Sequence, residues 1–113
     1  MFTIQKLTPE KCDAYKDALT QYIYESVRSS DYMDSYQMEN AADKCAELRA
    51  YLGAGKAVSY GAFDGQALVG FVWAYAYPYR EDGKRVYVSV LHVAEAYRNH
   101  SLGKVLLEQI ERE

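Results

Sequence analysis

One apolar stretch late in the chain, residues 86–93, includes three side chains that can exchange a proton. This stretch holds Tyr87, Ser89 and His92 among valines and a leucine. Of the three, His92 has the ordinary pKa closest to neutrality, which makes it the best candidate for proton transfer at pH 7. A histidine on a strand face also serves structural roles, so the residue type alone leaves both interpretations open.

The elements around this stretch predict a binding site for an anion. Residues 86–93 are β-branched and aromatic, which predicts a buried strand, and a polar connection follows them. A helix is expected next, because apolar residues then recur along one face: Leu102, Val105, Leu106 and Ile110. The first N–H groups of a helix lack partners and carry partial positive charge, and Gly103 would let a ligand approach them closely. The alternative is an ordinary strand–turn–helix in which Ser101 caps the helix.

The spacing of residues 91–107 resembles the acyl-CoA signature of the GNAT superfamily of N-acyltransferases. The matching residues are Leu91, Val93, Tyr97, Arg98, Ser101, Gly103, Leu106 and Leu107. Ser101 stands where the first glycine of that signature is usual. The resemblance implies an N-acetyltransferase that uses acetyl-CoA as its co-substrate and needs no metal.

The same resemblance implies which residues bind acetyl-CoA. The backbone of Leu91, His92 and Val93, on a strand opened by a β-bulge, would bind the pantetheine arm and polarise the thioester carbonyl. N–H groups of the loop and helix that follow would hold the pyrophosphate. These residues are Arg98, Asn99, His100, Ser101, Leu102, Gly103 and Lys104. Arg98 could add its charge directly, or could lie on the loop surface.

The general base and the acceptor pocket are less well defined. Many family members carry a glutamate on this strand, but residues 86–94 contain no acid, which leaves His92, Tyr87 and Ser89 as catalytic candidates. Four aromatic residues are candidates for binding the acceptor: Tyr32, Tyr36, Trp73 and Tyr75. Core packing is the alternative for the two residues on the strand, and anchoring of a loop is the alternative for the other two.

The N-terminal half predicts one strand and two helices. The strand covers residues 2–7, and the first helix begins after Thr8 and continues to Val27 as a single amphipathic stretch. The second helix follows a polar loop, with Asn40 and Asp43 resembling a capping pair.

From residue 57 onward the pattern predicts strands joined by tight turns. Residues 57–64, 67–79 and 86–93 would form an antiparallel meander. The order β-α-α-β-β-β-α indicates a single α+β domain over residues 1–113. It resembles the N-terminal part of the three-layer GNAT fold, whose usual C-terminal strands would be missing. Weak turnover by these residues alone is therefore expected.

Composition excludes several classes of protein. A net charge of only −3 does not suggest nucleic-acid binding, and no apolar run approaches the length of a membrane span. The N-terminus lacks the apolar region of a signal peptide. Cys12 and Cys45 each lie on an apolar helical face, which is typical of reduced core residues in a cytoplasmic protein.

Together these features predict an N-acetyltransferase acting on a primary amine of a small molecule or peptide. A non-catalytic acyl-CoA-binding or regulatory module is the first alternative, and an interaction domain without nucleotide binding is the second. The strand at residues 86–93 would form an open apolar edge. A homodimer through the region 86–110 is expected for that reason.

Overall fold

A computed structural model describes residues 2–28, 37–79 and 83–112, with the backbone alone at residues 28, 76–79, 83–87, 99 and 100. The acceptor candidates Tyr32 and Tyr36 lie outside the described residues. So do the side chains of Tyr87, Asn99 and His100.

Four antiparallel strands form one sheet in the order β1-β2-β3-β4. The strands are β1 (Phe2–Lys6), β2 (Ala57–Asp64), β3 (Ala67–Tyr79) and β4 (Gly83–Val93). Strands β2, β3 and β4 follow one another as the predicted meander, and β1 pairs with β2 after a long helical excursion. The predicted α+β fold is therefore confirmed.

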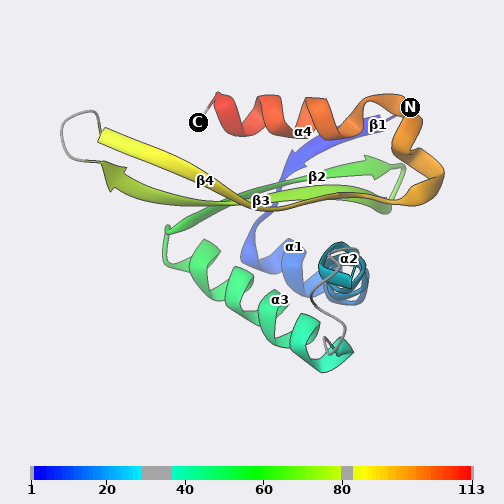
Figure 1. The fold of residues 1–113 in the computed structure, drawn as a ribbon, viewed down its shortest axis with the longest axis horizontal. Coiled ribbons are helices and arrows are strands. Elements are labelled where there is room, and N and C mark those ends of the chain that lie inside the picture. The colour runs from blue at the N-terminus through cyan, green and yellow to red at the C-terminus, as the bar shows by residue number, and fades with distance from the viewer. Residues whose placement is uncertain (1, 29–36, 80–82, 113) are drawn as a thin grey trace.

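Helices cover both faces of this sheet. Helices α1 (Pro9–Ala14), α2 (Lys16–Arg28) and α3 (Met38–Gly53) lie on one side, and α4 (Leu102–Glu111) lies on the other (Figure 1). A 3₁₀ helix, η1 (Glu95–His100), connects β4 to α4. The connection carries the chain from one edge of the sheet over to the face that α4 covers.

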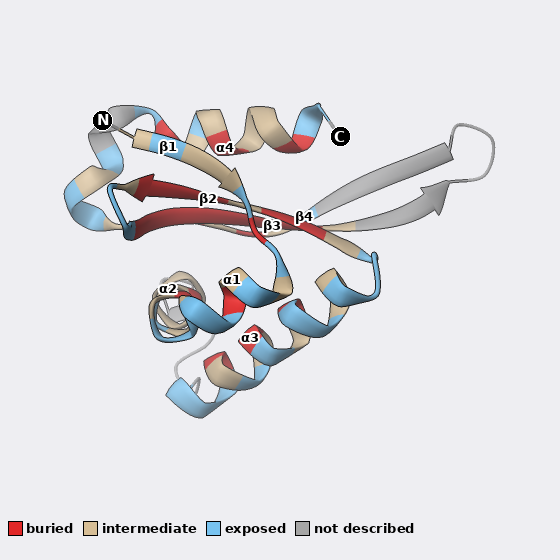
Figure 2. Ribbon diagram, turned by 180° about the vertical axis from the view of Figure 1, so that it is seen from behind, coloured by how far each residue is buried: buried red, intermediate tan, exposed pale blue. Residues whose placement is uncertain are grey.

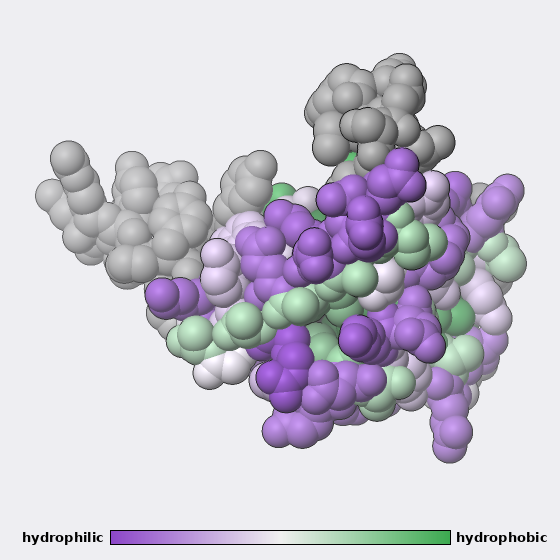
Figure 3. Space-filling view, turned by 90° about the horizontal axis from the view of Figure 1, so that it is seen from below, coloured by the Kyte–Doolittle hydropathy of each residue, from purple (hydrophilic) through white to green (hydrophobic). Residues whose placement is uncertain are grey.

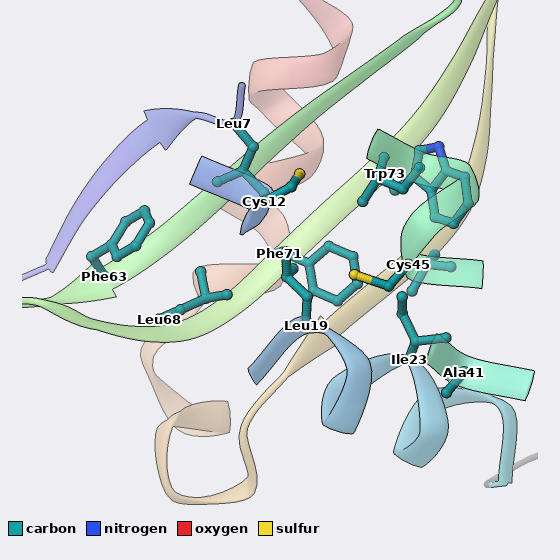
Figure 4. Packing of buried hydrophobic residues seen from close by; sticks show 12 residues of the cluster. Leu7, Cys12, Leu19, Ile23, Ala41, Cys45, Phe63, Leu68, Phe71 and Trp73 are labelled. Carbon is teal, nitrogen blue, oxygen red and sulfur yellow. The ribbon is translucent and has the colours of Figure 1, made fainter. Parts of the chain in front are cut away.

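Each face of the sheet has its own apolar cluster, and burial is deepest along β2 and β3 (Figure 2). The cluster beneath α1–α3 consists of Leu7, Cys12, Leu19, Ile23, Ala41, Cys45, Leu48, Phe63, Leu68, Phe71, Trp73 and Val90 (Figure 4). The cluster beneath α4 consists of Val58, Ala62, Val69, Val72, Ala74, Leu102, Leu106 and Ile110. Burial of three of the four residues in the predicted stripe confirms which face of α4 packs on the sheet.

The prediction of a single helix from Thr8 to Val27 is wrong at one position. The chain leaves helical geometry at Tyr15 (φ −111°, ψ 23°), which separates α1 from α2. Tyr15 instead reaches the sheet: its hydroxyl donates to the Gln66 carbonyl oxygen at 2.9 Å, and its ring packs edge-on against Phe63. The amphipathic pattern is continuous across Tyr15, so it does not reveal this division.

The predicted capping pair of α3 is also wrong. The helix begins at Met38, and the N–H of Gln37 donates to Oδ1 of Asn40 at 2.9 Å. Asn40 is thus the third residue of the helix and caps it from inside, while Asp43 lies a turn further along.

The outer surface of the three-helix layer is mostly hydrophilic, with paler apolar residues between the charged ones (Figure 3). None of the helices in the described part of the chain has the length and apolar character that crossing a bilayer requires.

Candidate active site

Strand β4 contains an irregularity in the middle of the candidate site. Trp73 of β3 pairs with Val90, and the next residue, Ala74, pairs with Val88. Ser89 is therefore the extra residue of a β-bulge, which bends the strand and interrupts its hydrogen-bonding ladder. The bulge expected in this strand is confirmed, and β4 is also the last strand of the sheet among the described residues.

Gly70 of β3 lets the two strands approach closely beyond the bulge. It lies opposite Val93, and a Cβ atom added to it would come within 3.1 Å of the carbonyl oxygen of His92. Any larger residue would force β4 outward at the point where the strand passes into η1. The glycine therefore fixes the position of the backbone of residues 91–93.

The loop after β4 is tied back to the sheet by three hydrogen bonds. The N–H of Ala94 donates to the carbonyl of Val69 at 2.8 Å, and Nε of Arg98 donates to the carbonyl of Val93 at 2.9 Å. The hydroxyl of Tyr97 donates to Oδ2 of Asp64 at 3.0 Å. The exposed Arg98 thus has a structural role in closing the loop, in addition to any contact with a ligand.

Ser101 has a left-handed backbone conformation (φ 59°, ψ 22°), and it is the one non-glycine residue with positive φ in the described part of the chain. A side chain in this conformation costs roughly 1–2 kcal/mol, which explains why glycine is usual here in the family signature. Its side chain makes no capping hydrogen bond with the helix. Because η1 ends in right-handed geometry at His100, the left-handed residue after it gives the backbone the form of an anion-binding nest.

The first turn of α4 continues this row of donors. The N–H of Val105 donates to the carbonyl of Ser101 at 3.2 Å, so the helical ladder starts there. Helix geometry leaves the preceding N–H groups, those of Leu102, Gly103 and Lys104, without carbonyls inside the helix. A Cβ added to Gly103 would meet nothing closer than Cδ2 of Leu91, at 3.9 Å. The backbone here has room for a ligand to approach, and the side chain of Leu91 lies beside it.

His92 lies on the opposite side of β4 from this row of donors, facing α2. Its side chain is 7% exposed, and its Nε2 lies 3.1 Å from Oε1 of Glu25. Nε2 of Gln21 donates to the other carboxylate oxygen of Glu25 at 2.8 Å. Burial lowers the pKa of His92 below its ordinary value, Glu25 opposes that shift, and Arg98 adds to it. Glu25 and Gln21 were not predicted, because a contact spanning 67 residues leaves no signal in local spacing.

The strand aromatics proposed for acceptor binding lie on the same face of the sheet as His92. Trp73 is fully buried under α3, with Nζ of Lys44 5.4 Å from its ring centre. Tyr75 is half-buried and donates a hydrogen bond of 3.2 Å to Oε1 of Glu47. Burial raises the pKa of Tyr75, and the charge of Glu47 raises it further. Trp73 thus contributes to the core, and Tyr75 is nearer to solvent.

A cavity of about 100 Å³ lies away from β4, among the three helices. Its lining includes Cys12 and Cys45, both free and buried as predicted, and burial raises the pKa of both thiols. The raised pKa keeps both thiols protonated near neutral pH, so neither cysteine is an activated nucleophile. Among the described residues there is no group of His, Cys, Asp and Glu side chains that could hold a metal ion.

Solved structures with this fold include several acetyltransferases. An aminoglycoside acetyltransferase from an uncultured soil metagenomic sample has 21% identity and a TM-score of 0.76, with 99% of this chain and 70% of that chain covered. A possible acetyltransferase from Clostridium difficile 630 has 12% identity and a TM-score of 0.79, with the same coverage. A predicted acetyltransferase with acetyl-CoA from Clostridium acetobutylicum has 9% identity and a TM-score of 0.70, with 97% and 71% covered.

At the level of sequence, no curated protein matches the chain. The family model described as the acetyltransferase (GNAT) family, in contrast, matches residues 20–113, which include the bulged strand, the nest and α4. The chain therefore belongs to the GNAT acetyltransferase family.

Proposed function

We propose that the protein is an N-acetyltransferase that transfers an acetyl group from acetyl-CoA to a primary amine. The observation that carries this proposal is the left-handed Ser101 between η1 and α4, which η1 connects to a bulged strand. The nest and the open first turn of α4 suit a pyrophosphate, because they offer several N–H groups and the positive end of a helix dipole to one anion.

We assign residues to three parts of acetyl-CoA: the pyrophosphate, the pantetheine arm and the thioester. N–H groups from Arg98 to Lys104 would hold the pyrophosphate, and the exposed Lys104 would add charge. The backbone of Leu91, His92 and Val93 would hold the pantetheine arm. Gly70 on β3 lets this backbone lie close to its neighbouring strand. When bound, acetyl-CoA supplies a thioester carbonyl, and a backbone donor at the bulge would stabilise the charge that develops on its oxygen.

The acceptor we propose is an amine on a small molecule or a peptide, met on the face of β4 that carries His92. Similarity to aminoglycoside acetyltransferases supports a small-molecule amine. Tyr75, together with Tyr32 and Tyr36, remains our candidate for the pocket wall, whereas the fully buried Trp73 belongs to the core. We propose the cytoplasm as the location.

Calorimetry with two ligands tests the cofactor part of this proposal. Acetyl-CoA should bind, and acetyl-pantetheine, which has the thioester without the pyrophosphate, should bind at least about tenfold more weakly, a difference of roughly 1.4 kcal/mol. Equal affinities would show that the nest makes no contact with the pyrophosphate. Failure of both to bind would favour an interaction domain.

A thiol-release assay with a panel of primary amines tests the catalytic part. We expect slow release of CoA that depends on the amine. Binding of acetyl-CoA without any release would instead identify a non-catalytic acyl-CoA-binding module, an alternative favoured by the lack of a carboxylate on β4 itself.

We also propose that the protein forms a homodimer through the region 86–110. Strand β4 is at the edge of the sheet. On this strand Val88 is a large apolar residue whose exposed fraction is 37%. Apolar edges tend to pair with another chain, and natural proteins protect them with charges such as lysine. Light scattering during size-exclusion chromatography should give a dimer for the wild type and a monomer for Val88→Lys. A wild-type monomer at tens of micromolar would contradict the proposal.

A further inference from the structure

Three side chains form a continuous chain of hydrogen bonds from the surface of α2 to the buried histidine of β4. Gln21 holds one oxygen of the Glu25 carboxylate at 2.8 Å, and the other oxygen lies 3.1 Å from Nε2 of His92. Gln21 is exposed, Glu25 is half-exposed and His92 is buried. The series therefore connects solvent with the face of β4 on which we place the amine.

This geometry determines where the proton of a neutral His92 lies. A carboxylate can only accept hydrogen bonds, so Nε2 must carry the hydrogen that Glu25 accepts. The lone pair is then on Nδ1, which is the basic atom of the ring. Burial favours the neutral ring near pH 7, because it lowers the pKa of His92.

We propose that Glu25 is a positioning residue for His92 in acetyl transfer, holding the imidazole in the tautomer whose Nδ1 accepts the proton of the amine, and that Gln21 holds Glu25 in place. The inference rests on the proposed function. The amine nitrogen forms a bond to the thioester carbonyl carbon and gives its proton to Nδ1. The carbon–sulfur bond then breaks, and the thiolate takes that proton from the imidazolium, so atoms and charge balance.

The groups around His92 explain why the carboxylate is needed. Glu25 and Tyr22 face it from α2, with the Tyr22 ring centre 5.2 Å from that of His92, and Phe71 lies opposite it on β3. Arg98 in η1 acts on it through its positive charge. Of these groups, Glu25 supplies the negative charge that stabilises a transient imidazolium, and the others are neutral or opposed to it. Burial of the His92 ring strengthens that interaction.

Kinetics of matched variants test the inference. Glu25→Gln keeps an acceptor for Nε2 but loses the charge, so kcat should fall about tenfold or more, and His92→Gln should lower it by about 10²-fold, within the range for a general base. Gln21→Ala should give a smaller loss of about twofold, the size expected when an exposed pair four residues apart on a helix is removed. The affinity for acetyl-CoA should stay unchanged in all three. Asp17→Asn, which removes an exposed carboxylate from the same helix, is the control and should match the wild type.

The pH dependence separates this role from a merely structural one. Glu25→Gln should move the acidic limb of the kcat/KM profile to lower pH, because the imidazolium loses its counter-charge. Activity lost in Glu25→Gln but retained in His92→Gln would overturn the inference, since the carboxylate would then act on the amine directly. An active wild type with an unaffected Glu25→Gln would also overturn it while leaving the proposed function intact.

Nuclear magnetic resonance of the two histidines gives a readout that needs no turnover. Long-range ¹H–¹⁵N spectra should show His92 of the wild type with its hydrogen on Nε2, and Glu25→Gln should lower its pKa and mix the tautomers. A wild-type ring with its hydrogen on Nδ1 would overturn the inference. Failure to bind acetyl-CoA would overturn the proposed function instead, and the catalytic role of Glu25 with it.

Discussion

The two sides of β4 differ in the chemical groups that form the proposed site. Towards α4, the proposed site consists of backbone: the left-handed Ser101 and the N–H groups in the first turn of the helix. Towards α2, it consists of side chains, Gln21, Glu25 and His92, joined by hydrogen bonds of 2.8 and 3.1 Å. The first arrangement suits binding of a fixed anion, and the second suits movement of a proton.

This difference determines which substitutions each part of the proposed site can tolerate. A backbone site depends on conformation, and many sequences can supply it as long as the turn and the helix form. A side-chain relay depends on three specific residues, and one substitution removes it. The affinity for acetyl-CoA should therefore tolerate changes in side-chain chemistry and respond to changes in backbone geometry. The turnover rate, in contrast, should respond mainly to substitution of the three side chains.

The largest effect expected on the backbone side comes from α4 itself. Leu106 is fully buried beneath the helix, and Leu106→Ala should lower the free energy of unfolding by about 2–5 kcal/mol. The next residue supplies a matched control: Leu107 is half-buried, and Leu107→Ala should cost roughly half as much or less. Urea unfolding measures both. Equal losses would mean that α4 is docked differently from the described packing.

Gly103 tests the backbone side without disturbing the core. Gly103→Val should weaken acetyl-CoA binding at least about tenfold, or roughly 1.4 kcal/mol, by placing a side chain where the ligand approaches. Gly53 is the control, because a Cβ added to either glycine meets its nearest neighbour at 3.9 Å. Calorimetry should show unchanged affinity for Gly53→Val. Two variants that bind alike would contradict a site at the first turn of α4.

Ser101 should respond to the removal of its Cβ in a direction opposite to that of most mutations. Ser101→Gly should raise the free energy of unfolding by up to about 1 kcal/mol, since glycine enters the left-handed region without steric cost. Ser101→Ala keeps the Cβ and should give no gain. If the alanine variant is the more stable one, the strain lies elsewhere and the conformation of this residue is not what limits stability.

On the side of β4 that faces α2, a smaller effect on the free energy of unfolding is expected when the pH falls. Because burial lowers the pKa of folded His92 below its ordinary value of 6.5, the unfolded chain binds a proton more readily. This contribution to stability is complete above about pH 6.5 and is lost as the pH falls through the folded pKa. Urea midpoints measured down to pH 5 should decline less in His92→Gln than in the wild type. Identical declines in the two proteins would mean that groups other than His92 cause the loss of stability at low pH.

The two sides also differ in how far the sequence predicts them. The strand, the loop and α4 are consecutive, so one stretch of sequence contains the proposed backbone site. The bulge that the family resemblance implied and the buried face of α4 are confirmed. Glu25 lies 67 residues from His92, and only the packing of α2 on the sheet brings them together. The hydrogen bond between Tyr15 and Gln66, 51 residues apart, is likewise not visible in local spacing. Local patterns predict elements and contiguous sites, and they do not predict contacts made by folding.

Mapping of backbone amides during titration with acetyl-CoA tests the central claim most directly. Two-dimensional ¹H–¹⁵N spectra should show the largest shift changes at residues 98–104 and 90–93, where the nest and the bulged strand lie. Residues lining the cavity among the three helices, such as Ala46, should change little. Changes centred on that cavity, or none at saturating acetyl-CoA, would contradict the placement of the cofactor at the N-terminus of α4.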